Sequence, residues 1–262
     1  MKIKVKKVGE HVDDLKSIPV VRPIVCRTEI QPRGGIYLKQ SADQIRGFRV
    51  QKMSQDKYKL VYFNARGRAE PIRFLFVALD IPFEDLRVGK TEWQELKHRT
   101  PSKKLPYLEI TSASGRAICY DESMAIARMV ARRHNLMGTT DEEYYRVERL
   151  IGQCADIDQL FYQIHLASSK HEAGRLTTNF ISKKAPELLE LIAQSLKASG
   201  GPYVLGDRPS FGDLLLLTTL DHVADIDFRL LRRPCFVTHR EAVFRMFPKL
   251  PEYLSKRPTT VL

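Results

Sequence analysis

The chain has 262 residues, of which 43% are hydrophobic and 28% are charged, and its formal net charge is +12. These proportions are ordinary for a globular protein, and they exclude a disordered, collagen-like or coiled-coil chain. No apolar run approaches the ~20 residues that a membrane-spanning helix needs, so we expect no membrane span.

Cysteine and histidine are spaced in ways that predict neither a disulfide framework nor a metal site. The four cysteines lie far apart with no CxxC pair, and the seven histidines include no HExxH spacing. We therefore expect no bound metal.

Positive charge is concentrated at the start of the chain, where residues 1–52 hold twelve Lys or Arg and five Asp or Glu. Basic and acidic residues are mixed in the remainder, which is typical of a solvated surface rather than a nucleic-acid site. Residues 1–54 are predicted to be a disordered extension, or a mis-assigned start with Met53 as the natural initiator. Intact-mass measurement of the native protein distinguishes the two. Binding of nucleic acid or an anionic membrane through residues 1–52 is a rival hypothesis, and it requires salt-dependent binding that is lost on truncation at Met53.

From residue 57 the patterns predict a small α/β domain with a mixed sheet. The expected order is strand, helix, strand, helix, two strands of a hairpin, and helix. The corresponding ranges are Lys57–Phe63, Ala69–Leu79, Phe83–Val88, Glu92–His98, Tyr107–Ile110, Arg116–Cys119 and Ser123–His134.

Strand signals vanish after Thr140, and the rest of the chain is predicted to be helical. The expected helices are Asp141–Leu166, Gly174–Ala198, Ser210–Ile226, His239–Met246 and Lys249–Ser255. Ser210 and Asp213 form an S-x-x-D capping box, and the apolar run that follows predicts a core helix.

Several separate motifs, in the right order, resemble the sigma-class glutathione transferases, especially those of parasitic flatworms. The motifs are KLVYFNARGRAE at 59–70, ESMAIAR at 122–128, DEEYY at 141–145, RLIGQ at 149–153 and YLSKRP at 253–258. The resemblance covers about residues 55–262. It implies a thioredoxin-like N-terminal domain over 55–137, and an all-helical domain over 138–262 with the electrophile site and the dimer contacts.

The resemblance implies that Tyr62 is the catalytic hydroxyl donor to the sulfur of glutathione, the co-substrate. Hydrogen bonding stabilises a thiolate whose cysteine-type reference pKa lies near ~8.5. Arg68 is expected to face the sulfur, and Arg73 to assist. The alternatives are that Tyr62 only caps the core and that both arginines form ion pairs with nearby acids.

The remaining glutathione-binding residues are also implied by the resemblance: Phe63, Trp93, Lys97, Lys104, Leu105, Pro106, Glu122, Ser123 and Asp156. Pro106 matches a cis proline that presents the Leu105 backbone to the ligand, and Glu122 and Ser123 receive the γ-glutamyl end. Trp93, Lys97 and Lys104 are expected near the glycyl carboxylate, although a lone tryptophan is usually core. Asp156 would reach the partner subunit's glutathione, with Asp158 as the competing choice.

One loop departs from the family pattern: Ser102 and Lys103 stand where the flatworm relatives tend to have glycine before the basic residue, which leaves the glutathione affinity open.

The predicted protein is a cytoplasmic, homodimeric transferase that conjugates glutathione to hydrophobic electrophiles. Peroxidase or prostaglandin D synthase activity would be an extension of the same chemistry. The electrophile site is expected to be apolar, built from the 62–68 loop, the helix with Phe161 and Tyr162, and the C-terminal residues. The alternative function is a non-enzymic ligand carrier or crystallin-like protein on the same fold.

Overall fold

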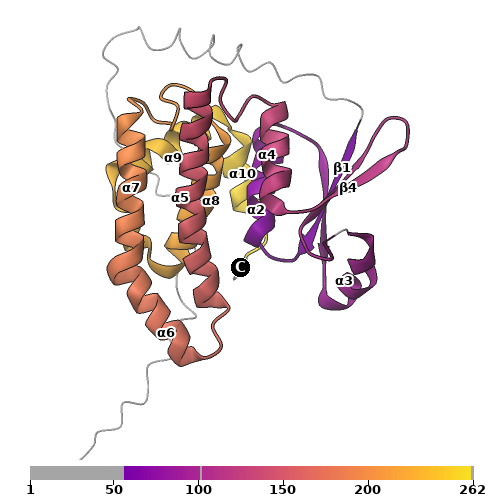
Figure 1. Cartoon of the computed structure of the whole chain (residues 1–262), viewed down its shortest axis with the longest axis horizontal. Helices are drawn as coiled ribbons and strands as arrows, with labels where there is room; N and C mark the ends of the chain where they lie inside the picture. The colour runs from indigo at the N-terminus through magenta and orange to yellow at the C-terminus, as the bar shows by residue number, and fades with distance from the viewer. Residues whose placement is uncertain (1–55, 101, 261–262) are drawn as a thin grey trace, which may run out of the picture. The chain divides into compact units, whose positions relative to one another are not determined.

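The structure is a computed structural model that describes residues 56–100 and 102–260 (Figure 1). The expectations for residues 1–54 lie outside the described residues. The order of elements confirms the predicted fold class, a small mixed sheet with its helices followed by an all-helical region.

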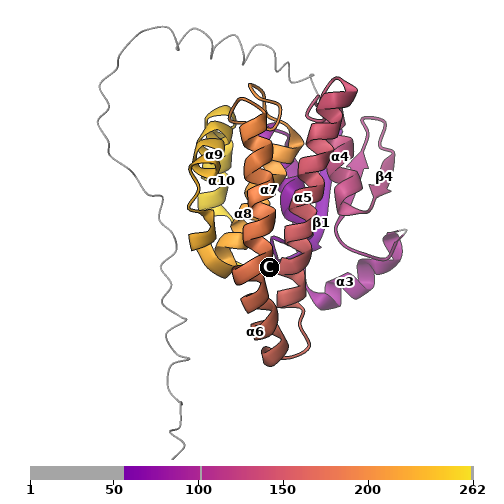
Figure 2. The same cartoon turned by 60° about the vertical axis from the view of Figure 1, so that its left-hand side comes forward.

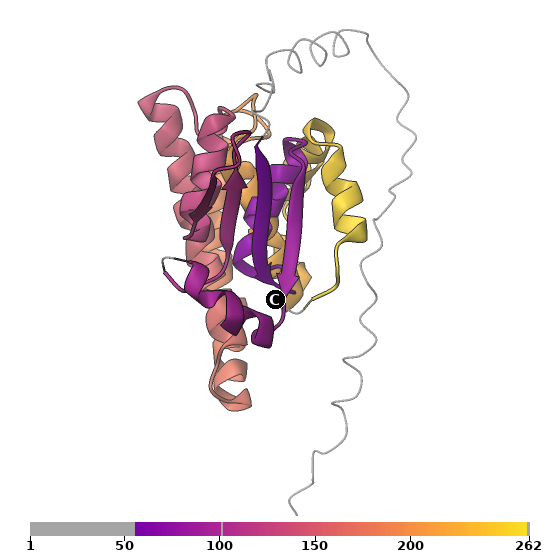
Figure 3. The same ribbon diagram turned by 90° about the vertical axis from the view of Figure 1, so that its right-hand side faces the viewer.

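The sheet has four strands in the order β2-β1-β3-β4, which Figure 3 shows in front of the helices. The strands are β1 (Lys57–Phe63), β2 (Phe83–Val88), β3 (Tyr107–Thr111) and β4 (Ala117–Tyr120). β1 pairs in parallel with β2 and antiparallel with β3, and β3 and β4 form the predicted hairpin. β1 is a central strand, and its last two residues, Tyr62 and Phe63, lie at the end of the sheet where the chain leads into α2.

Helices α2 (Glu70–Ala78) and α4 (Ser123–Arg133) lie between the sheet and the helical region, whereas α3 (Lys90–Leu96) lies on the other side of the strands (Figure 1). Short helical turns, η2 (Gly67–Ala69) and η3 (Lys97–Arg99), precede α2 and follow α3. Pro71 stands in the first turn of α2, as predicted, because a proline there removes no intrahelical hydrogen bond.

The helical region holds α5, α6, α7, α8, α9 and α10, and Figure 2 shows α5 and α7 side by side. Their bounds are Asp141–His165, Lys170–Asn179, Ala185–Ala198, Phe211–Asp227, Pro234–Met246 and Lys249–Lys256, with η4 at Phe180–Lys184 and η5 at Phe228–Leu231. The helix expected over 174–198 is helical throughout, but it begins earlier, at Lys170, and the π-helical turn η4 divides it into α6 and α7. Pro186, in the first turn of α7, has no N–H to continue the regular ladder.

Helix α8 is the centre of the helical region, as its apolar run predicted. Leu214 and Leu216 are fully buried, and the capping box is present, with the Ser210 amide donating to Asp213 Oδ2 at 2.8 Å. α8 packs against both α5 and α2. The junction of α2, α5 and α8 therefore fixes the end of β1 against the helical region.

Candidate active site

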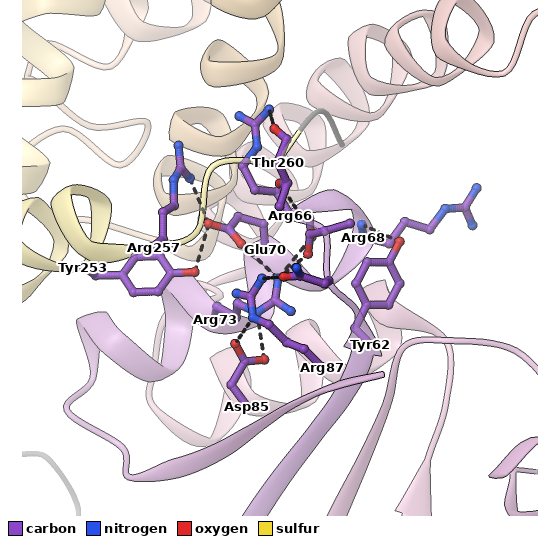
Figure 4. Close-up of polar contacts among 12 residues, drawn as sticks. Tyr62, Arg66, Arg68, Glu70, Arg73, Asp85, Arg87, Tyr253, Arg257 and Thr260 are labelled. Carbon is purple, nitrogen blue, oxygen red and sulfur yellow. Dashed lines mark hydrogen bonds and ion pairs between the residues drawn. The ribbon is translucent and has the colours of Figure 1, made fainter. Parts of the chain in front are cut away.

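Tyr62 lies one residue before the end of β1, and its hydroxyl faces the turn that leads into α2. The Arg68 amide donates to the Tyr62 oxygen at 3.3 Å (Figure 4). A phenol oxygen that accepts this bond keeps its own hydrogen for another acceptor. The residues found by sequence thus present an available hydroxyl donor at the strand end.

Gly67 is required beside that hydroxyl. Its φ is +41°, a left-handed conformation that glycine adopts at little cost, and a Cβ placed on it would lie 2.6 Å from the Tyr62 hydroxyl oxygen. A side chain at position 67 therefore requires the Tyr62 ring or the turn to move.

Arg68 is exposed, and its guanidinium carbon lies 5.7 Å from the centre of the Tyr162 ring. Burial raises the pKa of Tyr162, and Asp158 adds to the effect, so this phenol is neutral at physiological pH. Arg68 and Tyr162 bring the N-terminal and helical regions together at the mouth of a cleft.

Arg73 is fully buried, in contrast to Arg68. Its Nε donates to Asp85 at 3.0 Å, and its Nη1 donates to Glu70 at 3.1 Å and to the Ala65 carbonyl at 2.8 Å (Figure 4). Burial alone would lower the pKa of the guanidinium, but Asp85 and Glu70 outweigh it and raise the pKa. The ion pairs with nearby acids that the sequence left open are thus present for Arg73.

The loop after β1 is also bound from the C-terminal end of the chain. Glu70 Oε1 accepts hydrogen bonds from Tyr253 and Arg257, at 3.0 and 2.8 Å. Thr260 accepts from the Arg66 backbone and side chain, each at 3.3 Å (Figure 4). The C-terminal residues therefore hold the loop that positions Tyr62.

A cleft of about 910 Å³ lies between the 67–71 turn and the helical region. Its lining comes from both regions: Gly67, Arg68, Pro71, Ser123, Met124, Ala155, Asp158, Gln159, Tyr162, Gln163, Leu166, Ala167, Ser168, Glu172, Leu176, Leu215 and His222. The expected composition was partly wrong. The helix with Phe161 and Tyr162 lines the cleft as expected, but the described C-terminal residues do not, and the polar residues Asp158 and His222 do.

The residues predicted for the middle and the glycyl end of glutathione lie in α3, in η3 and in the loop before β3. The Leu105–Pro106 peptide bond is cis, as expected. Trp93 is only 7% exposed and packs in an apolar cluster with Val61 and Val88, and Phe63 and Leu105 lie against this cluster. That packing is the core role which the sequence left open for Trp93, and its contact with glutathione stays a prediction.

The loop before Leu105 contains the two residues that depart from the family pattern, Ser102 and Lys103. Lys103 has a φ of +54°, in the left-handed region that favours glycine. The Ser102 amide donates to Asp121 at 2.8 Å, which holds the loop in place. Lys104 is exposed and Lys97 is half-buried, so each of these cations has solvent-accessible surface.

Glu122 and Ser123 stand at the start of α4. Glu122 is the N-cap residue with a φ of +64° and an exposed side chain, a conformation that is uncommon for a residue with a Cβ. Ser123 lines the cleft, where the amides at the helix start favour a negatively charged ligand. This pair can receive an ammonium and a carboxylate at adjacent points.

The two aspartates of α5 differ in their surroundings. Asp158 accepts hydrogen bonds from His222 and Thr219, whereas Asp156 is exposed on the helix. Asp156 is therefore the more exposed of the two carboxylates, and its contact with the glutathione of a second subunit stays a prediction.

Sequence reasoning did not identify Glu70, Arg257 or His222 as parts of the site. Glu70 and Arg257 are separated by 187 residues, so no local pattern joins them. His222 carried a weak signal, as a polar residue in the largely buried helix α8. In the described residues, no group of three or more His, Cys, Asp or Glu side chains could hold a metal ion, and no helix is long and apolar enough to cross a membrane.

A small thioredoxin-like domain followed by an all-helical domain, with a cleft lined from both, is the arrangement expected of the glutathione transferases. Models of the glutathione S-transferase N-terminal and C-terminal domains match residues 58–132 and 155–257. The chain belongs to the glutathione S-transferase family, an enzyme family whose substrate is glutathione.

Individual relatives and structures agree with this assignment. The Schistosoma bovis glutathione S-transferase class-mu 28 kDa isozyme is 40% identical over 210 residues, which are 79% of this chain and 99% of the relative. Human hematopoietic prostaglandin D synthase is 30% identical over 210 residues, 78% of this chain and 98% of the relative. The solved Fasciola hepatica sigma class GST has a TM-score of 0.73 at 39% identity, and the match covers 79% of this chain and 99% of that one.

Proposed function

We propose that Tyr62 donates a hydrogen bond to the sulfur of glutathione, and that the resulting thiolate attacks hydrophobic electrophiles held in the cleft. The observation that carries this proposal is the bond from the Arg68 amide to the Tyr62 oxygen. It leaves the phenol hydrogen for a ligand and aims the hydroxyl toward the turn at the mouth of the cleft.

The energy required is modest. A hydrogen bond to a charged group contributes about 1.5–3 kcal/mol, and each 1.36 kcal/mol lowers a thiol pKa by about one unit. One such bond moves a thiol of pKa ~8.5 to the neutral range, where much of it is ionised. In the attack, the sulfur forms a bond to the electrophilic carbon, and the electron pair of the breaking bond goes to the leaving group or to an adjacent carbonyl.

Glutathione would be held along the sheet edge. The Leu105 backbone pairs with the middle of the tripeptide, and Glu122 and Ser123 bind the γ-glutamyl end. Trp93, Lys97 and Lys104 are assigned to the glycyl end, with Phe63 packed beside them. Asp156 of each subunit is assigned to the glutathione of the other in a homodimer, and the compartment is proposed to be the cytoplasm.

The two arginines are given different roles. Arg68 lies at the cleft and raises the local potential beside the sulfur, which favours the thiolate. Arg73 has its guanidinium carbon 6.0 Å from the Tyr62 ring centre and binds the carbonyl of Ala65. It is therefore proposed as a positioning residue that holds the loop, rather than as a group that contacts the sulfur.

The test is ultraviolet titration of the glutathione thiol bound to the wild type and to Tyr62→Phe. We expect a thiol pKa clearly below that of free glutathione in the wild type and close to it in the variant, with kcat/KM lowered by about 10- to 100-fold. Retention on immobilised glutathione should be similar for both proteins, because the remaining contacts are intact. Identical titrations would remove Tyr62 from the mechanism.

A second candidate activity is the glutathione-dependent isomerisation of a prostaglandin endoperoxide. The similarity to human hematopoietic prostaglandin D synthase favours it. Product analysis after incubation with the endoperoxide, with and without glutathione, tests this activity separately from conjugation.

A further inference from the structure

A histidine and an aspartate form a hydrogen-bonded pair in the wall of the cleft, away from Tyr62. His222 of α8 and Asp158 of α5 are joined through Nδ1 and Oδ1 at 2.8 Å, and Thr219 donates to the other carboxylate oxygen at 3.1 Å. A carboxylate only accepts, so Nδ1 carries hydrogen in both the neutral and the charged ring. The atom that remains for a ligand is Nε2.

The ring is fixed by aromatic contacts as well. It stacks on the buried Phe161, with ring centres 4.1 Å apart and an angle of 12°, and meets the edge of Tyr162 at 5.8 Å. These contacts and the bond to Asp158 define one orientation of the imidazole.

Nε2 makes no hydrogen bond to any described residue. Nε2 also keeps some accessible surface, because the fully buried side-chain atoms of the described residues that lack a partner do not include it. His222 lines the cleft, and we therefore assign that surface to the cleft.

The position of His222 along the cleft follows from its neighbours. The Tyr162 ring lies 5.7 Å from the guanidinium carbon of Arg68 and 5.8 Å from the His222 ring, and the Arg68 amide contacts Tyr62. An electrophile that reacts at Tyr62 would thus extend along Tyr162 toward His222. Pro71, Met124, Leu176 and Leu215 supply apolar lining for its body.

We propose that Nε2 of His222, whose ring is oriented by Asp158, binds a hydroxyl group of the electrophile. This hydroxyl group lies some distance along the molecule from the reactive carbon. A neutral imidazole presents an acceptor at Nε2 and a charged one presents a donor. A hydroxyl can donate and accept, so it matches both forms of the ring. The substrate class is then a hydroxylated apolar electrophile; the proposal rests on the proposed function only in placing the electrophile in this cleft.

The test compares 2-nonenal with otherwise identical alkenals that carry a hydroxyl on the fourth, sixth or ninth carbon. In the wild type we expect at least one hydroxylated probe to have a KM about two- to tenfold below that of 2-nonenal, since one hydrogen bond contributes this much. His222→Phe should lose the difference, measured within that variant as the ratio of the KM for the hydroxylated probe to the KM for 2-nonenal.

His165→Phe is the matched control. His165 also packs on Phe161, at 4.1 Å between ring centres, but it does not line the cleft, so this variant should keep the preference. No preference in the wild type for any hydroxylated probe, or a preference that His222→Phe retains, overturns the proposal.

A second measurement uses the wild-type protein alone and does not depend on catalysis. The wild type is titrated with S-nonylglutathione and with hydroxylated S-nonylglutathiones, and the imidazole nitrogens are followed by proton–nitrogen NMR. We expect a shift of the His222 Nε2 signal only with a hydroxylated compound, and an equal response to all compounds overturns the proposal. Failure of the proposed function would appear instead as unchanged thiol titration in Tyr62→Phe, independently of this readout.

Discussion

The Arg257 guanidinium donates to Glu70 Oε1 at 2.8 Å and so joins the C-terminal end of the chain to the first turn of α2. Glu70 is 2% exposed, and Arg73 binds its second oxygen at 3.1 Å. Arg73 in turn binds the loop that follows Tyr62. The loop that follows β1 is therefore held by charged residues from the start of α2 and from the C-terminal end of the described chain.

Arg257→Ala should lower the free energy of unfolding by about 2–3 kcal/mol, because it leaves Glu70 and Asp221 with fewer partners in a buried setting. Denaturant unfolding measures the change. Lys256→Ala is the control, since Lys256 is exposed and pairs with Glu252 on the helix surface, where such a pair contributes about 0.3–0.5 kcal/mol. Equal effects of the two substitutions would contradict the role given to Arg257.

The fold was predictable because its signals are local. The alternation in β1, the apolar spacing of α2 and the capping box of α8 each lie within a few residues of sequence, and each is present in the structure. The π-helical turn between α6 and α7 was missed although Pro186 lies within the predicted helix, where a proline removes an N–H and signals an interruption of the regular ladder.

The residues of the candidate site could be predicted only where they belong to a short sequence motif. Tyr62, Arg68 and Ser123 lie in short motifs, and the structure brings Arg68 and Ser123 to one cleft with Tyr62 at its mouth. The pairs Glu70–Arg257 and Asp158–His222 depend on tertiary packing between distant elements. No periodicity or spacing in one sequence encodes such pairs.

Gly67→Ala should impair catalysis by moving the Tyr62 hydroxyl. The new Cβ would stand 2.6 Å from that oxygen, so either the ring or the turn must shift. We expect kcat/KM to fall by about 10- to 100-fold, the loss of one hydrogen bond to a charged sulfur, with a raised thiol pKa in bound glutathione.

Gly115→Ala separates this effect from backbone strain. Gly115 also has a positive φ, +81°, but nothing lies within 4 Å of its added Cβ. Both variants should lose about 1–2 kcal/mol of stability from the left-handed conformation, and only Gly67→Ala should change the thiol titration. A normal titration in Gly67→Ala would show that Tyr62 does not depend on this turn.

Asp213→Asn should be among the most destabilising single substitutions in the helical region. The side chain is fully buried, and it accepts from the amides of Val204 and Ser210 at 2.9 and 2.8 Å and contacts His239 Nε2 at 3.1 Å. An amide NH₂ would face one of these donors, and we expect a loss of about 3–5 kcal/mol in denaturant unfolding. Asp207→Asn, at an exposed position of the same loop, should leave stability unchanged.

Glu143 should make the stability of the chain depend on acid pH. Arg208 and the amide and hydroxyl of Thr139 lower its pKa from 4.5 to about 2 in the capping box of α5. A carboxylate with a lowered pKa in the folded state contributes stability above pH 4.5 that is lost as the pH falls toward 2. Glu143→Gln should therefore cost about 1 kcal/mol at neutral pH, and the difference from the wild type should shrink through this window. The neighbouring Glu142→Gln, which removes only an exposed pair with Arg146, should give a nearly constant small difference. Urea unfolding of the three proteins across this pH range measures the effect, and parallel curves for both variants would rule out Glu143 as the titrating group.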